Sequence, residues 1–450
     1  MGLIVLVFVR PFDLVEELQG IPFLYIFCGL AIFGYVVDLK LRISEWRFAP
    51  HLAWTVAFLA WCLLTVFVRV PAELVRSTIA LVIVFIVYFL LAHGVRTFKA
   101  LELVALTIVA CSIWVGVVCV HQGLQPLSCV AIGAGDHLSS GGVPDGRQCE
   151  SLLECYEDSP DPEADYRCEH VGWFGLSSTA RGRVRYVGIL QDPNEVAMVL
   201  SVALPFAFAL YQVRRTRKRF WILLVSFLCI GGAVVLSKSR GGQLVFLMVC
   251  GVYVVHRFGW RGIVPGALLA LPILLLGGRS GSRADSSSLE RLECMFEGIE
   301  MVKTWPFLGA GYDQFTEHHH LTAHNSYLLA AAELGFIGMF LWSIILYLCF
   351  KIGVVAHRTL DHEEARVARI WGLALIASFS GLAIGTFFLS FTYHPILWLY
   401  IGFAGAFYAA VKAHQRDWTV RASAWDVVLV GGGDLAIIFA IFVYTRLKLG

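Results

Sequence analysis

The sequence predicts an all-α integral membrane protein, a polytopic bundle of about 12 transmembrane helices with two large periplasmic loops. Of its 450 residues, 58% are hydrophobic and only 15% are charged, and the mean hydropathy is +0.73. Soluble domains carry about a quarter charged residues. Because any water-exposed fold needs a polar surface, a soluble core cannot absorb this apolar excess. The composition therefore excludes a soluble enzyme, a nucleic-acid-binding protein and a coiled-coil scaffold.

Apolar runs recur at the length that the hydrocarbon core requires, about 20 residues per helix. The predicted spans are residues 22–37, 52–69, 77–93, 99–120, 195–212, 220–237, 241–256, 261–277, 326–350, 370–392, 395–411 and 425–444. The apolar run Met1–Val9 is too short to span comfortably. It is either a truncated first span or a half-inserted segment.

These spans divide the chain into five parts. We expect N-terminal membrane helices (1–120), a cysteine-containing periplasmic loop (121–194), central membrane helices (195–277), a second periplasmic loop with an interfacial helix (278–325) and C-terminal membrane helices (326–450). The orientation follows from the basic residues, which are enriched in cytoplasmic loops. The densest basic cluster is Arg214, Arg215, Arg217, Lys218 and Arg219, so we place that loop in the cytoplasm. Alternation then puts both long loops outside.

Four of the twelve cysteines fall in the first periplasmic loop, namely Cys129, Cys149, Cys155 and Cys168. Such a cluster suits an oxidising compartment, and four cysteines allow three disulfide pairings. A zinc site is the alternative. The spacing C-x5-C-x12-C is not a usual zinc pattern, so the sequence favours two disulfides and no metal.

Polar and charged groups gather at helix ends on the periplasmic side. Because such groups are costly near a membrane, they are functional candidates. The first cluster contains Arg183, Arg185, Asp192 and Asn194, where the loop re-enters the membrane. Helix capping alone would explain Asp192 and Asn194. The arginines are not needed for a cap.

The second cluster is the short turn 237–242, which carries Lys238 and Arg240 on the outer side. This position runs against the positive-inside preference, so we expect an anionic group to meet them, although snorkelling is the alternative. The third cluster runs from Arg291 through Gly311. It begins with an amphipathic helix over 289–303 that Trp305–Pro306 stops.

The fourth cluster begins at His324, immediately before an apolar helix capped by Asn325 or Ser326. A helix N-terminus favours negative charge, so His324 is well placed to meet an anionic headgroup. Helical geometry turns Glu333 to the opposite face. We therefore expect Glu333 to contact another helix.

In this order, the four clusters resemble the O-antigen ligase and O-antigen polymerase superfamily of polytopic glycosyltransferases. The resemblance runs from about residue 183 to 340 and also includes Asp192–Asn194 and Ser239–Gly241. Its most specific parts are Pro306-Phe-Leu-Gly-Ala-Gly311, His324-Asn-Ser-Tyr-Leu328 and Glu333-Leu-Gly335. The cysteine-bearing loop at 121–182 is not a general feature of that family, and the second loop is short beside that of many ligases.

The resemblance implies metal-independent, cofactor-free, inverting transfer of a glycan from undecaprenyl diphosphate to an acceptor hydroxyl, at the periplasmic face of the bacterial inner membrane. Arginine side chains, whose planar guanidinium groups donate paired hydrogen bonds, would stabilise the leaving diphosphate. Arg240 and Arg291 are the first candidates, with Arg185 and Arg283 behind them. His324 would be the catalytic base. Asn325 would orient the histidine or a phosphate, and the remaining predicted substrate-binding residues are Asp192 and Asn194.

The leading hypothesis is a polymerase that joins lipid-linked repeat units of an O-antigen or exopolysaccharide. A ligase that transfers the glycan to lipid A-core is the close alternative. A transporter of lipid-linked oligosaccharide is more remote, because it would place polar groups deep in several helices, where Asp434 is the main example here. If the protein were only a structural scaffold, substitutions at His324 would have no effect on its function. The expected partners are the lipid-linked glycan, its acceptor, the bilayer and a chain-length regulator, but no nucleic acid.

Overall fold

The protein is described by a computed structural model that covers residues 1–41, 48–132, 142–157, 159–161, 164–180, 182–268, 282–360 and 365–449, without the side chains of residues 16, 282–288 and 449. Within these residues, 11 helices are long and apolar enough to cross a membrane. Sheet is confined to three short strands of the described chain. The predicted all-α polytopic membrane fold is thus confirmed.

The chain forms two compact units, each built from two separate stretches of sequence. Unit 1 contains Met1–Phe23 and Ala105–Arg279, and unit 2 contains Leu24–Val104 and Ser280–Gly450. Each unit has its own buried apolar interior, and each holds some of the predicted site residues.

Unit 1 is organised around α8 (Pro193–Val213), which packs against α9 (Arg217–Leu236) and α10 (Arg240–Phe258). Most residues of α8 are buried. The unit also contains α1 (Gly2–Phe8), α2 (Pro11–Leu14), a short turn η1 (Glu16–Leu18) and most of α6 (Phe98–Leu124). The run Met1–Val9 is therefore helical over seven residues.

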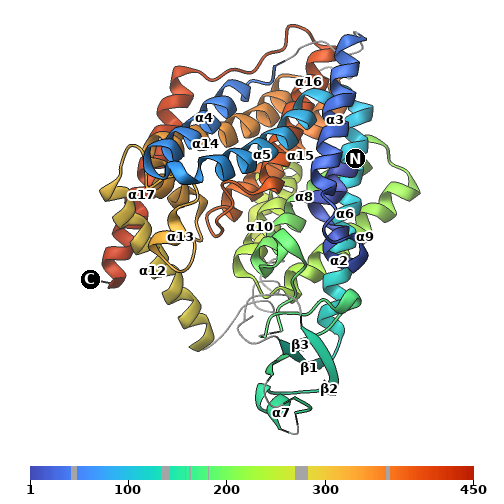
Figure 1. Ribbon diagram of the computed structural model, residues 1–450. Coiled ribbons are helices and arrows are strands. Elements are labelled where there is room, and N and C mark those ends of the chain that lie inside the picture. Colours follow the sequence, from blue (N-terminus) through green and yellow to red (C-terminus); the bar gives the residue numbers. More distant parts are fainter. Residues whose placement is uncertain are drawn as a thin grey trace. The chain divides into compact units, whose positions relative to one another are not determined.

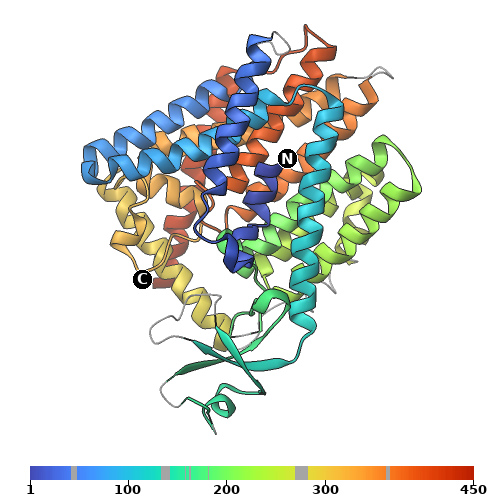
Figure 2. The same cartoon turned by 45° about the vertical axis from the view of Figure 1, so that its right-hand side comes forward.

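A small antiparallel sheet follows α6 directly, as Figure 2 shows. Its strands β1 (Leu127–Ile132), β2 (Val143–Gln148) and β3 (Asp165–His170) lie in the order β2-β1-β3, and α7 (Leu152–Tyr156) connects two of them. This sheet was not among the predicted elements. Three further short turns of unit 1 are η3 (Trp173–Gly175), η4 (Gly188–Leu190) and η5 (Gly259–Gly262).

Two disulfides close the sheet, Cys129–Cys155 and Cys149–Cys168. The predicted disulfides are confirmed, and the structure selects one of the three pairings. The sulfur atoms of Cys129, Cys149 and Cys155 also lie within 4.8 Å of one another. Since all three are oxidised, none offers the thiolate that the alternative zinc site requires.

Unit 2 contains the remaining spans (Figure 1). They are α3 (Phe23–Lys40), α4 (Leu52–Arg69), α5 (Leu74–Gly94), α14 (Ser326–Thr359), α15 (Arg366–Gly385), α16 (Pro395–His414) and α17 (Ala424–Leu449), with a short turn η2 (Pro71–Glu73) before α5. The central helix is α14, which packs against α4, α15 and α17, and α5 packs against α16.

The predicted amphipathic helix exists as α12 (Ser282–Thr304), and it ends immediately before Trp305–Pro306 as expected. Its apolar face packs on α14 and α17 and buries Leu292, Ile299 and Met301. A short helix, α13 (Phe315–His318), follows. The predicted span 261–277 lies largely outside the described residues, since the described helical segment ends at Leu268.

Helix α14 is broken at Gly335, where φ is +69° and ψ is −178°. The break leaves backbone groups of α14 without their helical hydrogen-bond partners. Residues 306–311 supply hydrogen bonds to these groups. Ala310 and Gly311 donate their N–H groups to the carbonyl oxygens of Ala332 and Glu333, both at 2.9 Å, and Phe336 donates to Pro306 at 2.8 Å. This pairing satisfies the backbone at the break.

The two glycine motifs fit against each other without room for a side chain. A Cβ on Gly309 would lie 2.2 Å from the Glu333 carbonyl, and a Cβ on Gly335 would lie 2.2 Å from the Phe307 carbonyl oxygen. Both glycines also have positive φ. The Pro306–Gly311 and Glu333–Gly335 motifs are thus the two halves of one backbone interlock.

Candidate functional site

In unit 1, Asn194 joins the first two predicted clusters. Its Oδ1 atom accepts hydrogen bonds from Arg183 at 2.9 Å and from the Ser239 hydroxyl at 2.7 Å. Its Nδ2 atom donates to Asp192 at 2.8 Å. Arg183 also donates to the Ser237 carbonyl oxygen at 2.8 Å. The buried Arg183, which belongs to the first predicted cluster but had no assigned role, therefore fixes the turn that carries Lys238 and Arg240.

The N-terminal ends of two helices, α8 and α10, lie at this hydrogen-bond network. Asp192 caps α8 by accepting from the Asn194 N–H at 2.8 Å, as predicted for a cap. Ser239 caps α10 by accepting from the Gly242 N–H at 3.0 Å. Lys238, just before that cap, has a left-handed backbone with φ +49°. Arg240 follows the cap, and its side chain is exposed at the positive end of α10.

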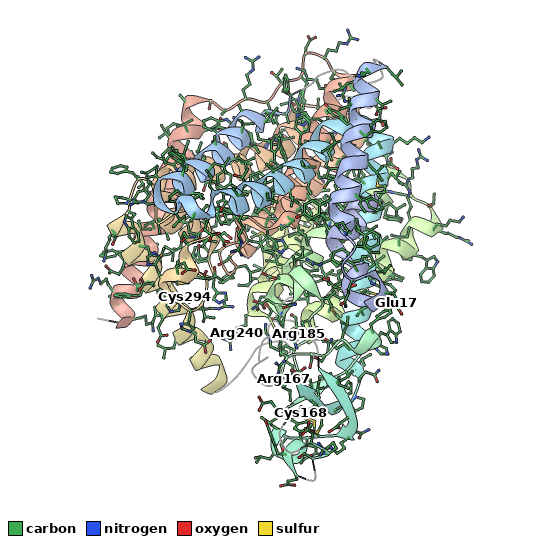
Figure 3. The ribbon with its side chains drawn as sticks, viewed as in Figure 1. Glu17, Arg167, Cys168, Arg185, Arg240 and Cys294 are labelled. Carbon is green, nitrogen blue, oxygen red and sulfur yellow. A yellow bond between two sulfur atoms is a disulfide. The ribbon has the colours of Figure 1, made fainter. Side chains whose placement is uncertain are left out.

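Arg185 is buried and held by the chain itself. Its Nε donates to the Ser177 carbonyl oxygen at 2.9 Å, and its Nη2 lies 3.5 Å from Glu169 Oε2. Arg167 approaches the other oxygen of Glu169 at 3.7 Å. Burial lowers the pKa of the Arg185 guanidinium, and the Glu169 carboxylate opposes that shift. Figure 3 shows Arg167 and Arg185 in the region of the disulfide-bonded sheet.

In unit 2, His324 stands at the entrance of α14. It has a left-handed backbone with φ +49°, and its N–H donates to the Ser390 hydroxyl at 2.9 Å. Asn325 is the N-cap of α14 and accepts from the Leu328 N–H at 3.0 Å. The hydroxyl of Ser326 donates to the Leu389 carbonyl oxygen at 2.6 Å. The segment 386–392 therefore holds His324 in a strained conformation with its side chain half-buried.

Asn325 is fully buried, and its Nδ2 has no hydrogen-bond partner within the described part of the chain. The capping role of its Oδ1 is established by the structure. The predicted contact with His324 or a phosphate stays a prediction.

Glu333 lies below this entrance and is almost fully buried. Its two oxygens accept from the N–H groups of Phe315 at 2.9 Å and Asp313 at 3.2 Å. It therefore contacts the turn that leads into α13 and holds it against α14. Burial raises the pKa of the neighbouring Asp313 carboxyl above its ordinary value, and Arg76 opposes that shift.

The remaining predicted arginines lie on α12. Arg291 is half-buried there, and the side chain of Arg283 is outside the described residues. Of the predicted site residues, Arg185, Asp192, Asn194 and Arg240 lie in unit 1, and Arg291, His324 and Asn325 lie in unit 2. Proximity in sequence to a helix start identified Asp192, Arg240 and Asn325. Arg183 belongs to the first predicted cluster, but its bond to the Ser237 carbonyl oxygen could not be predicted from local sequence.

Comparison with known proteins gives one family match. Residues 225–343 match the model of the family described as O-antigen ligase. The resemblance predicted from the motifs is thereby confirmed over this stretch, which includes the entrances of both α10 and α14. The match supports the predicted enzyme class, a membrane glycosyltransferase of the ligase or polymerase type. No curated protein matches the sequence.

Among solved structures, one matching chain comes from the work described as "Structural coordination of polymerization and crosslinking by a peptidoglycan synthase complex". It is 16% identical, with a TM-score of 0.41, and the match covers 84% of this chain and 99% of that chain. A likeness at this level assigns no function.

Proposed function

We propose that this protein transfers a glycan from a polyprenyl diphosphate carrier to an acceptor hydroxyl at the periplasmic face of the bacterial inner membrane. The observation that carries the proposal is the family match over 225–343, because it contains both helix entrances at which basic residues stand. The described geometry supports it in two ways. Each entrance presents a helix N-terminus, and each has a basic residue with positive φ directly before its cap.

Each step has a residue suited to it. His324 accepts the proton of the acceptor hydroxyl as its oxygen attacks the anomeric carbon. The bond between that carbon and the diphosphate oxygen breaks, and the anomeric centre is inverted. The bonding electrons stay on that diphosphate oxygen, and the diphosphate leaves still attached to its lipid. Arg240 and Arg291 stabilise this growing negative charge with paired N–H donors.

We assign a supporting role to the buried network of unit 1. Arg183 and Asn194 hold the turn 237–239, and that turn sets the direction of Arg240. Arg185 and Glu169 connect the same stretch of chain to the disulfide-bonded sheet. These residues act through Arg240 and need no contact with the substrate.

Polymerisation of lipid-linked repeat units remains our leading assignment within this class. Ligation to lipid A-core is the second candidate, and the description of the matched family favours it. Glycan analysis of a deletion strain separates them. A polymerase deletion leaves single repeat units without longer chains, whereas a ligase deletion leaves full-length polymer on undecaprenyl diphosphate. Repeat units trapped in the cytoplasmic leaflet would contradict both and indicate a transporter.

A further inference from the structure

The short helix α7 of the disulfide-bonded sheet presents an apolar face to solvent. Leu152, Leu153 and Tyr156 are 48%, 74% and 45% exposed. At 100° per residue, their directions around the helix fall within about 100° of one another, so the three side chains share one face. Single apolar residues on a surface are ordinary, but a contiguous exposed group of them indicates a binding surface. We call these three residues the apolar face of α7.

The sheet holds this face in a fixed position. Cys155 of α7 is buried and bonded to Cys129 of β1. Arg147 donates hydrogen bonds to the carbonyl oxygens of Cys155 at 2.8 Å and Glu157 at 2.7 Å, and Asp145 pairs with its guanidinium at 2.6 Å. The C-terminal carbonyl groups of α7 are therefore satisfied. A partner that binds the apolar face does not have to order the helix first.

The apolar face lies away from the membrane spans of unit 1. Helix α6 ends at Leu124, and β1 begins at Leu127. In both Figure 1 and Figure 2, α7 lies at the side of the sheet away from α6. The apolar face therefore meets water and not hydrocarbon. Exposure of apolar side chains to water is unfavourable, and a protein partner that covers them removes this cost.

The rim of this face is negatively charged. The exposed acidic residues on α7 and beside it are Glu150, Glu154, Glu157 and Asp161. Within the described part of 142–170, the two arginines, Arg147 and Arg167, are each paired with a carboxylate. Hydrogen bonds from the Glu150 N–H and the Ser151 hydroxyl lower the pKa of Glu154, so this carboxylate stays ionised. The rim thus keeps its negative charge at neutral pH.

We propose that the apolar face of α7 and its acidic rim form a docking surface for a basic segment of another protein. The leucines and Tyr156 would make the central apolar contacts, and the carboxylates would meet lysine or arginine side chains. The same negative charge opposes a second copy of this chain and an anionic membrane surface. A glycan fits the face poorly, because Leu152 and Leu153 offer it no hydrogen bonds.

This docking surface is separate from the transfer chemistry. It lies within 121–182, the loop that the family resemblance does not include, and it contains none of the predicted site residues. The surface gives that loop a task, which is to recruit a partner protein. Its test measures contact alone, so the result does not depend on whether the proposed function is correct.

The experiment is photo-cross-linking of the full-length protein in living cells, with benzoylphenylalanine in place of Leu153. Mass spectrometry then identifies the cross-linked peptide. We expect a segment of another protein that has a net positive charge and apolar side chains. The same photoreactive residue in place of Val143 is the matched control. Val143 is also 74% exposed, but it lies four residues before Arg147 along β2. It should give at least about fivefold less of this adduct.

Substitutions in the Leu153 cross-linking protein test the charge and the apolar contact separately. The Glu150→Lys, Glu157→Lys double variant reverses two exposed charges and keeps the bond from Arg147, which uses the Glu157 backbone. We expect the adduct to fall at least about fivefold. Leu152→Ser should lower it by a similar factor. Glu17→Lys changes an exposed acidic residue that Figure 3 shows apart from the sheet, and it should leave the adduct unchanged.

Resistance of the four sheet cysteines to maleimide without reductant checks that each variant keeps its sheet. If the lysine double variant fails this check, Glu150→Gln with Glu157→Gln replaces it, and we expect the adduct to fall at least about twofold. Cross-links from Leu153 only to lipid, glycan or another copy of this chain would overturn the proposal. So would the absence of an adduct, a cross-linked segment without positive charge, or an adduct that does not respond to the charge substitutions.

Discussion

Arg240 is the residue at which charge, helix geometry and exposure coincide. It follows the Ser239 cap of α10, and the buried network of Arg183 and Asn194 fixes the turn before it. A helix N-terminus reinforces the attraction of such an arginine for a diphosphate. If Arg240 binds the diphosphate as proposed, its role depends on the planar guanidinium and not on positive charge alone.

Arg240→Lys keeps the charge but removes the paired donors. If Arg240 binds a diphosphate oxygen pair, we expect glycan transfer to fall at least about tenfold. Arg257→Lys, an exposed change at the other end of α10, is the matched control and should keep full activity. Quantitative glycan profiling of complemented cells measures both. Full activity of Arg240→Lys would mean that this residue only snorkels.

Cys294 offers a test of burial on α12. Burial raises the pKa of its thiol to about 11, so at neutral pH it is almost entirely protonated in the folded protein. Because only the thiolate reacts, alkylation of Cys294 should speed up about tenfold per pH unit between pH 7 and 9. In urea-unfolded protein the rate should level off above about pH 8.5. Peptide mass spectrometry after timed alkylation measures both rates. The same plateau in the folded protein would contradict the burial.

The conformation of helix α14 depends on hydrogen bonds from a segment outside the helix. Its break at Gly335 is stable because the stretch 306–311 supplies the missing hydrogen bonds. The same stretch receives Arg69, which donates to the Gly309 carbonyl oxygen at 3.0 Å, while Trp61 donates to the Leu334 carbonyl oxygen at 2.8 Å. Helix α4 thus holds both sides of the interlock.

Gly309→Ala should destabilise this interlock. The new Cβ would lie 2.2 Å from the Glu333 backbone at a position with φ +66°, so backbone must move. We expect a loss of about 2–4 kcal/mol, seen as a lower unfolding temperature in detergent. Gly432→Ala on α17 is the control, because a Cβ there has nothing within 4 Å in the described structure. Equal unfolding temperatures for the two variants would show that the interlock is not tightly packed.

The sequence predicts those elements whose cause is local. Apolar length alone identifies α4 over 52–69, and the cap and proline signals mark the starts of α8 and α14 and the end of α12. The sheet at 127–170 escapes prediction because its strands have no clean alternation and β2 contains both Pro144 and Gly146. The break at Gly335 requires a partner from the loop before α14, which no local pattern reveals.

The candidate site follows the same rule, because residues with a local role were predicted and roles that depend on distant partners were not. Asp192 and Asn325 are recognisable as caps from their positions, but the hub role of Asn194 depends on Ser239, far along the chain. The engagement of Arg185 by Glu169 depends on the disulfide-bonded sheet, which was itself unpredicted. We expected Glu333 to contact another helix, and its hydrogen bonds go to the turn before α13.

At the scale of the whole molecule, the two disulfides stabilise a sheet that supports the arginine stretch of unit 1. Cys168 and Glu169 are neighbours on β3, and Glu169 faces Arg167 and Arg185. Loss of a native disulfide typically costs about 2–5 kcal/mol in a small domain. The sheet should therefore need oxidation to keep its shape.

We predict that Cys129, Cys149, Cys155 and Cys168 react with a maleimide only after a reductant is added. The Cys149→Ser, Cys168→Ser double variant should lose the native sheet and become sensitive to protease within the loop, because β3 is no longer tied to the segment after β2. Cys28→Ser, which alters a free cysteine of unit 2, is the control. Ready labelling of the four thiols in non-reducing conditions would refute the disulfides.

We propose that His324 is the base of a glycan transfer. The most direct measurement is a reconstituted reaction in which purified protein, lipid-linked repeat units and acceptor release undecaprenyl diphosphate. We predict that His324→Ala lowers the release rate at least about 100-fold, as expected for loss of general-base catalysis, with unchanged folding. His320→Ala, a change in the loop before it, should retain the rate. Release by His324→Ala at the wild-type rate would contradict the claim.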